Sequence, residues 1–281
     1  MITVNRHCEE RSNLSFFIKV QICFCFLFTS LSIAQTQKVT LIKTIDTKGK
    51  FFTTDKLGNM YIIEKSEIKK YNENGDLQQT YNYKDLGAIN YLDATDPFKV
   101  MLFQPEFLKI RTLDSRLNLI GELDLNYQHD LGLPRLACVT DDGNLWIYDQ
   151  QNQRLIKIDQ KGNKLLAGNS LSQTLNQSTL NPKSLVATDT WLLMRNVDST
   201  IYVFDKFGNY FRSVQVNCDE NFQAMGNLVL YLNAQIIYSR DVTNGFEKKL
   251  ELPELKDAQV VRMEQNRLYL KKEDKIEIYS F

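Results

Sequence analysis

The sequence predicts an all-β protein built from one repeated unit, and two observations carry this prediction. A polar residue followed by a short turn recurs at Asn72, Asp114, Asp159 and Asp205, with spacings of 42, 45 and 46 residues. Short segments rich in aliphatic and aromatic residues, which favour strands, precede each of these turns. Repeats of roughly 40 residues are typical of propeller blades or of helical arrays, and the strand-forming composition selects a β-propeller.

The repeat is clearest at residues 139–162, which read as a Gly-Asn turn, an apolar strand, a polar turn, a second strand and an Asp-x-x-Gly turn. The second strand of each unit is continuously apolar and must be covered on both faces, as neighbouring blades would do. Six such strands are expected at residues 60–63, 99–103, 145–148, 191–194, 228–232 and 268–270. Third strands are expected at residues 67–71, 107–113, 154–158, 200–204, 235–238 and 275–279. We therefore predict six blades; five or seven remain alternatives because the second, fifth and sixth copies depart from the turn pattern.

The two ends of the repeat region predict how the ring closes. The chain ends at Phe281, directly after a third strand, and an unassigned strand at residues 38–45 precedes the first unit. Pairing this strand with the last blade would complete that blade and leave fewer open edges. We expect one propeller domain over residues 35–281, and we expect deletion of residues 38–45 to lower the melting temperature.

The N-terminal 34 residues are predicted to be a leader and signal peptide. Residues 20–34 form an apolar run that follows Lys19 and ends in a small-x-small site, with cleavage expected between Ala34 and Gln35. The run is short for a membrane span, which needs about 20 apolar residues, although a retained anchor is the alternative. Glu9 and Glu10 are unusual before a signal peptide, so translation could start downstream. The expected location is periplasmic or secreted, with no stable membrane span after cleavage.

Composition excludes several classes of function. The net charge is zero and basic residues are scattered among acidic ones, which disfavours nucleic-acid binding. The sequence has no Walker loop, dinucleotide fingerprint or Cys-x-x-Cys pair, so we expect no cofactor. Two cysteines, Cys138 and Cys218, remain after cleavage, and we expect buried thiols rather than a disulfide.

The turns Gly58-Asn59, Asp141-Asp142-Gly143-Asn144 and Gly208-Asn209, with the Asp-x-x-Gly turns, resemble those of six-bladed propellers of the NHL and TolB-like kind over residues 36–281. Residues 96–103 and 117–121 loosely resemble uncharacterised exported propellers of Bacteroidota. The resemblance implies that an enzyme of this kind would carry metal-binding His, Asn or Glu side chains around the central tunnel.

The strands expected to line that tunnel carry few such groups. These first strands are predicted at residues 51–54, 91–94, 136–140, 185–188, 222–224 and 260–263, and Asp93 is their only carboxylate. Asp141 and Asp142 could suggest calcium, but the sequence places no suitable bidentate acid later in that loop, so we interpret them as turn residues. We predict no catalytic residue and no metal site.

Binding residues are instead predicted on two irregular connections between blades, on the face opposite the regular turns. Loops on a rigid scaffold commonly bind partners. The first connection, residues 126–134, offers Tyr127, His129, Asp130, Leu131 and Leu133 as contact residues. The second connection, residues 168–182, is long enough that it is either disordered or a further binding loop, and both alternatives remain.

These observations predict a non-catalytic exported propeller that binds a protein partner and is otherwise monomeric. An outer-membrane secretion or assembly complex is one candidate setting. The alternative is a ligand-binding propeller, or a lyase-like or hydrolase-like enzyme, that uses the central funnel.

Overall fold

The computed structural model describes residues 39–64, 67–82, 91–128, 130–177, 180–218 and 221–281. Val39–Phe281 form one compact unit, separate from Met1–Lys38. The predicted leader, signal peptide and cleavage site lie outside the described residues, so they remain predictions. No helix among the described residues is long and apolar enough to cross a membrane.

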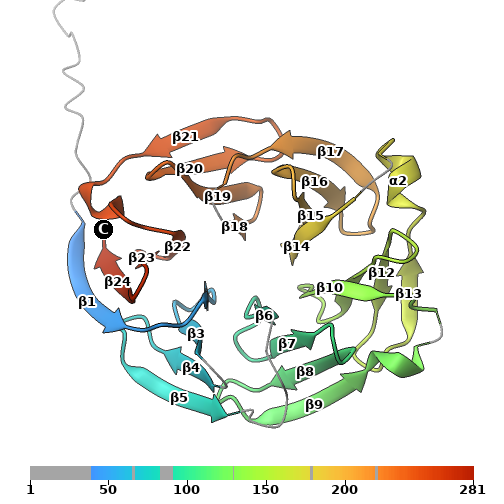
Figure 1. The fold of residues 1–281 in the computed structure, drawn as a ribbon, viewed down its shortest axis with the longest axis horizontal. Helices are drawn as coiled ribbons and strands as arrows, with labels where there is room; N and C mark the ends of the chain where they lie inside the picture. The colour runs from blue at the N-terminus through green and yellow to red at the C-terminus, as the bar shows by residue number, and fades with distance from the viewer. Residues whose placement is uncertain (1–38, 65–66, 83–90, 129, 178–179, 219–220) are drawn as a thin grey trace, which may run out of the picture. The chain divides into compact units, whose positions relative to one another are not determined.

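Six four-stranded antiparallel sheets surround a central axis, which confirms the six-bladed β-propeller (Figure 1). Blade one consists of β2 (Phe51–Thr54), β3 (Met60–Glu64), β4 (Glu67–Tyr71) and β5 (Leu77–Asn82). Blade two consists of β6 (Tyr91–Asp93), β7 (Val100–Gln104), β8 (Lys109–Leu113) and β9 (Leu119–Asp124). Blade three consists of β10 (Pro134–Val139), β11 (Leu145–Asp149), β12 (Arg154–Ile158) and β13 (Lys164–Ala167). Blade four consists of β14 (Pro182–Ala187), β15 (Trp191–Asn196), β16 (Thr200–Asp205) and β17 (Tyr210–Gln215). Blade five consists of β18 (Phe222–Met225), β19 (Leu228–Asn233), β20 (Ile236–Asp241) and β21 (Glu247–Leu250). Blade six consists of β22 (Val260–Glu264), β23 (Arg267–Lys271), β24 (Lys275–Ser280) and β1 (Thr40–Asp46). Among the described residues, three short helices lie between blades: η1 (Leu125–Tyr127), α2 (Leu171–Thr174) and η2 (Pro253–Leu255).

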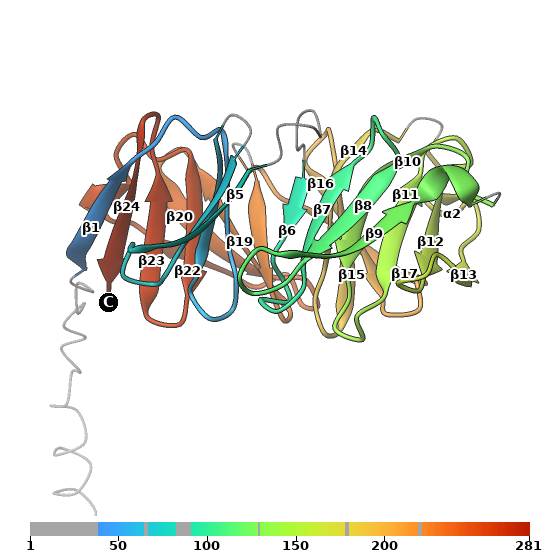
Figure 2. The same ribbon diagram turned by 90° about the horizontal axis from the view of Figure 1, so that it is seen from below.

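The ring closes as the two ends of the repeat predict. Strand β1 pairs antiparallel with β24, from Thr40 opposite Ser280 to Asp46 opposite Lys275. Figure 2 shows the two strands side by side at the edge of the ring. Ile45 is buried against neighbouring apolar residues, so the N-terminal strand contributes both backbone pairing and core packing.

The core lies between the blades, where the middle strands are covered on both faces. All five residues of β7 and all five of β11 are buried. Trp146 and Tyr148 of blade three pack with Leu192 and other buried residues of blade four. The Gly208 turn rests on this cluster: a Cβ atom there would lie 2.8 Å from the Trp146 ring, and φ is +83°. Glycine is therefore required both by the contact and by the backbone conformation.

The regular turns use their acidic residue to bind backbone amides. Asp205 Oδ1 accepts hydrogen bonds from the amides of Phe207 and Asn209, at 2.9 Å each. The same arrangement recurs at Asp55, Asp114 and Asp159. This is the Asx-turn chemistry expected of Asp and Asn at such positions.

The Asp142 turn has a different partner. Asp142 forms an ion pair with Lys157, with 2.7 Å between Nζ and Oδ2. Burial works to raise the pKa of Asp142, but hydrogen bonds from Lys157 and Thr140 hold it well below its usual range. Both bonds belong to the fold of blade three, which supports the turn interpretation. In the part of the chain that the structure describes, no group of three His, Cys, Asp or Glu side chains could hold a metal ion.

Candidate functional site

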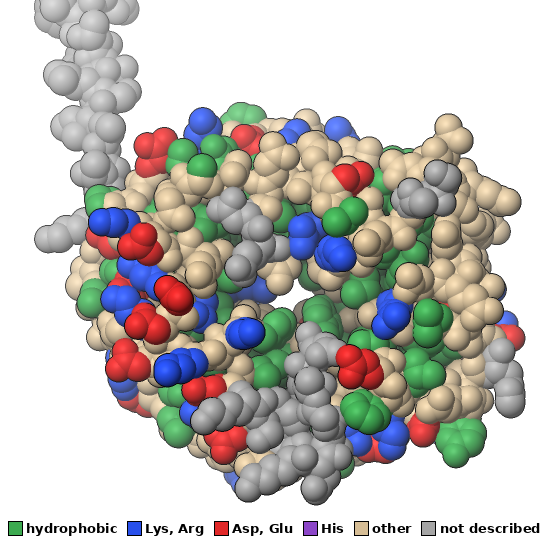
Figure 3. Space-filling model, viewed as in Figure 1, with side chains coloured by type: hydrophobic (Ala, Val, Ile, Leu, Met, Phe, Trp, Pro, Cys, Tyr) green, Lys and Arg blue, Asp and Glu red, His purple; other side chains and the backbone are tan. Residues whose placement is uncertain are grey.

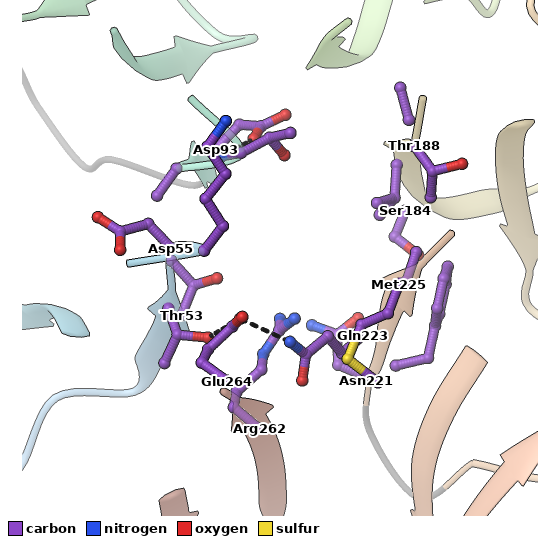
Figure 4. Close-up of a pocket in the computed structure, with 18 of the residues that line it drawn as sticks. Thr53, Asp55, Asp93, Ser184, Thr188, Asn221, Gln223, Met225, Arg262 and Glu264 are labelled. Carbon is purple, nitrogen blue, oxygen red and sulfur yellow. Dashed lines mark hydrogen bonds between the residues drawn. The ribbon is translucent and has the colours of Figure 1, made fainter. Parts of the chain in front are cut away.

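A cavity of about 380 Å³ lies at the centre of the ring. Figure 3 shows the opening on this axis, and Figure 4 shows the polar side chains that converge there. The lining comes from the first strands β2, β6, β14, β18 and β22 and from the turns that follow them. The first strand is thus the innermost strand of each blade, as the sequence predicts.

Several inner polar side chains connect one blade to the next. Asp93 of blade two is buried and accepts a hydrogen bond from the amide of Val139 in blade three, at 2.9 Å. Gln223 of blade five binds the backbone of Met263 in blade six twice, accepting from the amide at 2.8 Å and donating to the carbonyl at 3.0 Å. These bonds satisfy buried backbone groups that no ladder reaches, so the residues serve the fold.

Glu264 makes a third connection, at the end of β22. Its Oε1 accepts from Thr54 Oγ1 of blade one at 2.7 Å and from Gln223 Nε2 of blade five at 2.6 Å (Figure 4). Burial raises the pKa of Glu264 to about 7, although these two bonds and the nearby Arg262 guanidinium oppose the shift. The Glu264 carboxyl therefore changes its charge close to neutral pH.

Arg262 projects from the same strand into the cavity (Figure 4). Burial lowers the pKa of its guanidinium, which the charges of Glu264, Tyr91 and Asp93 partly offset. Its Nε is buried and has no hydrogen-bond partner. Arg262 thus brings a positive charge to the cavity without the backbone contacts that occupy Asp93 and Gln223.

Tyr91 extends past blade three on the inner side of the ring. Its hydroxyl donates to the carbonyl of Leu185 in blade four at 3.1 Å. Its ring also packs edge-on against Phe51 of blade one, with centroids 6.4 Å apart. Because Tyr91 joins blade two directly to blade four, it covers the inner strand of blade three, which explains why β10 does not line the cavity.

Four of the five predicted contact residues are described, and they lie at a second place, the seam between blades two and three. Tyr127, Asp130 and Leu131 line a hollow of about 330 Å³ there, together with Ile156 of blade three. Leu133 lies beyond the hollow; it is 37% exposed, and its amide donates to Asp149 Oδ1 at 2.9 Å. His129 lies outside the described residues, and its predicted contact role stays a prediction.

The seam residues differ in exposure and partners. Tyr127 is 76% exposed, the highest value among the large apolar side chains in the described chain. Asp130 forms an ion pair with Lys164 and its carbonyl accepts from Arg154 Nη2 at 2.7 Å. Leu131 is partly buried against the core of blades two and three. The connection is therefore fixed to blade three by the contacts of Asp130 and Leu131, whereas the Tyr127 side chain is exposed to solvent.

The sequence predicts that the irregular connections and the regular turns lie on opposite faces of the ring. This prediction is wrong at the seam between blades two and three. Gln128 packs against the turn glycine Gly162, where a Cβ atom would lie 2.4 Å from Gln128 Nε2. The physical reason is the strong twist of each blade, which makes its outermost strand run around the circumference (Figure 1). The end of β9 consequently meets the regular turn of the following blade.

Exposed aliphatic residues also lie on the outermost strands of blades two and three. Leu119 and Ile120 on β9 are 49% and 55% exposed, and Leu165 and Leu166 on β13 are 47% and 39% exposed. We call Leu119, Ile120, Tyr127, Leu165 and Leu166 the outer wall of blades two and three. Strand β13 pairs with β12 on one side, and all four of its residues are exposed.

The second long connection packs against the propeller. It contains α2, whose Leu171 is 3% exposed, and Leu180 further along is 7% exposed. Both lie in the apolar cluster between blades three and four. Of the two alternatives that the sequence left for this connection, disorder does not describe these packed residues.

Sequence reasoning missed Arg262 and Glu264. Arg262 lies within the predicted inner strand, but a guanidinium is neither a carboxylate nor a metal ligand, the two kinds of group that the predicted function made relevant there. Glu264 lies one residue beyond the predicted end of that strand, because β22 extends to Glu264. A signal was present: a charged pair two residues apart on an inner strand faces the same side.

No protein-family model matches the chain, and no curated protein matches it either. Several solved propeller structures are similar to this chain. A virginiamycin B lyase from Staphylococcus aureus is 13% identical, with 87% of this chain and 100% of that chain covered and a TM-score of 0.57. BamB from Moraxella catarrhalis is 12% identical, with 87% and 100% covered and a TM-score of 0.51. The Pan2 WD40 domain from Neurospora crassa is 8% identical, with 87% and 96% covered and a TM-score of 0.57.

These similarities show the β-propeller fold and leave the activity open, because an enzyme and other propellers match equally well. The narrower resemblance to NHL and TolB-like propellers and to exported propellers of Bacteroidota stays a prediction.

Proposed function

We propose that this chain is a non-catalytic propeller that binds a partner protein through the outer wall of blades two and three. The observation that carries the proposal is the exposure of large apolar side chains on the outermost strands β9 and β13 and at Tyr127. Tyrosine and large aliphatic residues supply contact area at little conformational cost, and aromatic residues are enriched at protein interfaces.

The hollow beside Tyr127 adds shape to this surface. Its volume of about 330 Å³ and its lining by Leu131, Ile156 and Lys164 suit one large side chain of a partner. The open edge of β13 could in addition pair with an extended segment, as in β-strand addition. A peptide-like segment of the partner is therefore the binding element that we favour.

The central cavity supports the non-catalytic part of the proposal. Asp93, Gln223 and Glu264 use their polar atoms to join neighbouring blades. A general acid or base must reach a substrate proton, and Asp93 is turned to backbone amides instead.

Affinity capture from membranes of the native host tests the binding surface. The wild type, the double variant Leu165→Ser/Leu166→Ser and the control Phe98→Ser would be compared by quantitative mass spectrometry. Phe98 is 62% exposed on another turn of blade two, so it matches the loss of exposed apolar area. We expect one discrete partner to be at least tenfold depleted in the double variant alone. Recovery of a bare monomer, or the same partners with all three proteins, would contradict the proposal.

We further propose that the protein is exported, with a mature chain that begins at Gln35, to the periplasm or the medium. The apolar run at residues 20–34 supports this. N-terminal sequencing of the protein from its host should find Gln35. An N-terminus at or near Met1 would refute it. An outer-membrane secretion or assembly complex would be the setting if the captured partner is an outer-membrane protein.

A further inference from the structure

Two hydrogen-bond donors in the central cavity lack partners. Ser184 on β14 is 7% exposed, and its Oγ is buried without a hydrogen bond. Arg262 Nε on β22 is also buried without a hydrogen bond. Both residues line the 380 Å³ cavity (Figure 4). Buried polar atoms are nearly always paired with protein or with a bound group. An unpaired buried donor costs about 1–3 kcal/mol, so a ligand that supplies an acceptor to either group would recover part of that cost.

The carboxylates near Arg262 do not supply that acceptor. Asp93 is directed to the amides of Thr95 and Val139, at 2.8 and 2.9 Å. Asp55 is directed to the turn that it caps and to the Tyr61 hydroxyl at 2.8 Å. The Oε1 atom of Glu264 already accepts two hydrogen bonds. The guanidinium charge therefore remains available to an incoming anion.

We propose that Arg262 and Ser184 form a binding site in the central cavity for a small organic carboxylate. A planar guanidinium binds a carboxylate through two parallel hydrogen bonds, and a hydroxyl can donate a third. This inference does not depend on the protein-binding proposal, because it concerns other residues on the inner strands.

The remaining lining defines the rest of the ligand. Val186, Phe222, Ala224 and Met225 present apolar surface inside the cavity, and its volume lies in the range of small-molecule sites, roughly 300–1,000 Å³. A ligand with one carboxylate and a compact apolar body fits both parts. Inorganic phosphate fits less well, because a second negative charge would face Glu264 and Asp55.

The charge of Glu264 should couple binding to pH. Its pKa of about 7 means that the carboxyl is neutral at pH 6 and charged at pH 8. The groups around it are Arg262 on its own strand, Asp55 from blade one and Tyr269 from β23, with Lys56, Asp93 and Asp189 elsewhere on the lining. Protonation of Glu264 removes a negative charge beside the site, so an anion should bind several-fold more tightly at pH 6 than at pH 8.

Fluorine NMR titrations of the full propeller test the site. The probes are 4-fluorobenzoate and 4,4,4-trifluorobutyrate, with 4-fluorobenzyl alcohol as the neutral control and inorganic phosphate as a competitor. We expect at least one carboxylate to bind the wild type, with no detectable binding of the alcohol and weak competition by phosphate. Arg262→Gln should weaken carboxylate binding at least tenfold and Ser184→Ala several-fold. Lys183→Gln, which removes an exposed cation outside the cavity lining, should leave it unchanged within about twofold.

Melting curves would check that each variant folds, and a crystal soaked in 4-bromobenzoate gives a readout on the wild type alone. The anomalous bromine peak should lie in the central cavity with the carboxylate on Arg262. The proposal is overturned if neither carboxylate binds the wild type, if Arg262→Gln and Ser184→Ala bind as tightly as the wild type, or if the alcohol binds equally well. A bromine peak only outside the cavity would also overturn it.

Discussion

The innermost and outermost strands of the blades come from the same repeat, yet their side chains serve different purposes. On the inner strands, Asp93, Gln223 and Glu264 each hydrogen-bond to a neighbouring blade. On the outer wall, Leu165 and Leu166 of β13 are exposed and lie outside the apolar core. Polar groups around a tunnel can thus be structural, whereas exposed apolar groups on an edge strand have no such role. Four experiments test this contrast.

Deletion of Thr40–Ile45 should have the largest effect on stability. Strand β1 is also an outermost strand, but it pairs with β24 and buries Ile45, unlike the open β13. We expect a loss of roughly 3–5 kcal/mol, or a fall in melting temperature of about 10 °C or more, measured by calorimetry. The matched double variant Leu165→Ser/Leu166→Ser should change the free energy of unfolding by less than about 1 kcal/mol. An unchanged melting temperature after the deletion would refute ring closure by β1.

Gln223→Ala should have the second largest effect. The substitution leaves the amide and carbonyl of Met263 without their partner and removes one donor from Glu264. Unpaired buried groups cost about 1–3 kcal/mol, so we expect a loss near 3 kcal/mol in denaturant unfolding. Gln79→Ala on the exposed strand β5 is the control, with an expected change within about 0.5 kcal/mol. Equal losses in both variants would remove the structural role assigned to the inner side chains.

Glu264→Gln should stabilise the protein in a pH-dependent way. The folded-state pKa of about 7 lies above the usual value of 4.5, so the folded state keeps a proton that the unfolded state has already lost. Wild-type stability should therefore fall as pH rises from 4.5 to 7 and then level off. After allowance for partial exposure, the variant should exceed the wild type by about 2 kcal/mol at pH 8 and match it near pH 4.5. Parallel curves for the two proteins would contradict the raised pKa.

Much of the fold could be predicted from the sequence, because several blades repeat the same turn residues at a regular spacing. The spacing of Asp159 and Asp205 and the unpaired strand before residue 46 were enough to infer six blades and their closure. The expected burial of Cys138 in an apolar strand is confirmed, and its thiol is free.

The site was less predictable because it depends on contacts between residues far apart in the chain. The contact of Gln128 with Gly162 follows from the twist of the blades, which no local pattern specifies. The bond from Thr54 to Glu264 joins positions 210 residues apart and exists only because the ring closes. The unpartnered Arg262 could be recognised only after its neighbours had been placed.

Photo-crosslinking in the native host can show whether the outer wall of blades two and three contacts a partner protein. A photoreactive benzoylphenylalanine would replace Tyr127 in one strain and Phe98 in another, since both side chains are highly exposed in the same part of the ring. We predict a discrete adduct of defined mass from position 127 and none of that mass from position 98. No adduct from position 127, or the same adducts from both positions, would contradict the account.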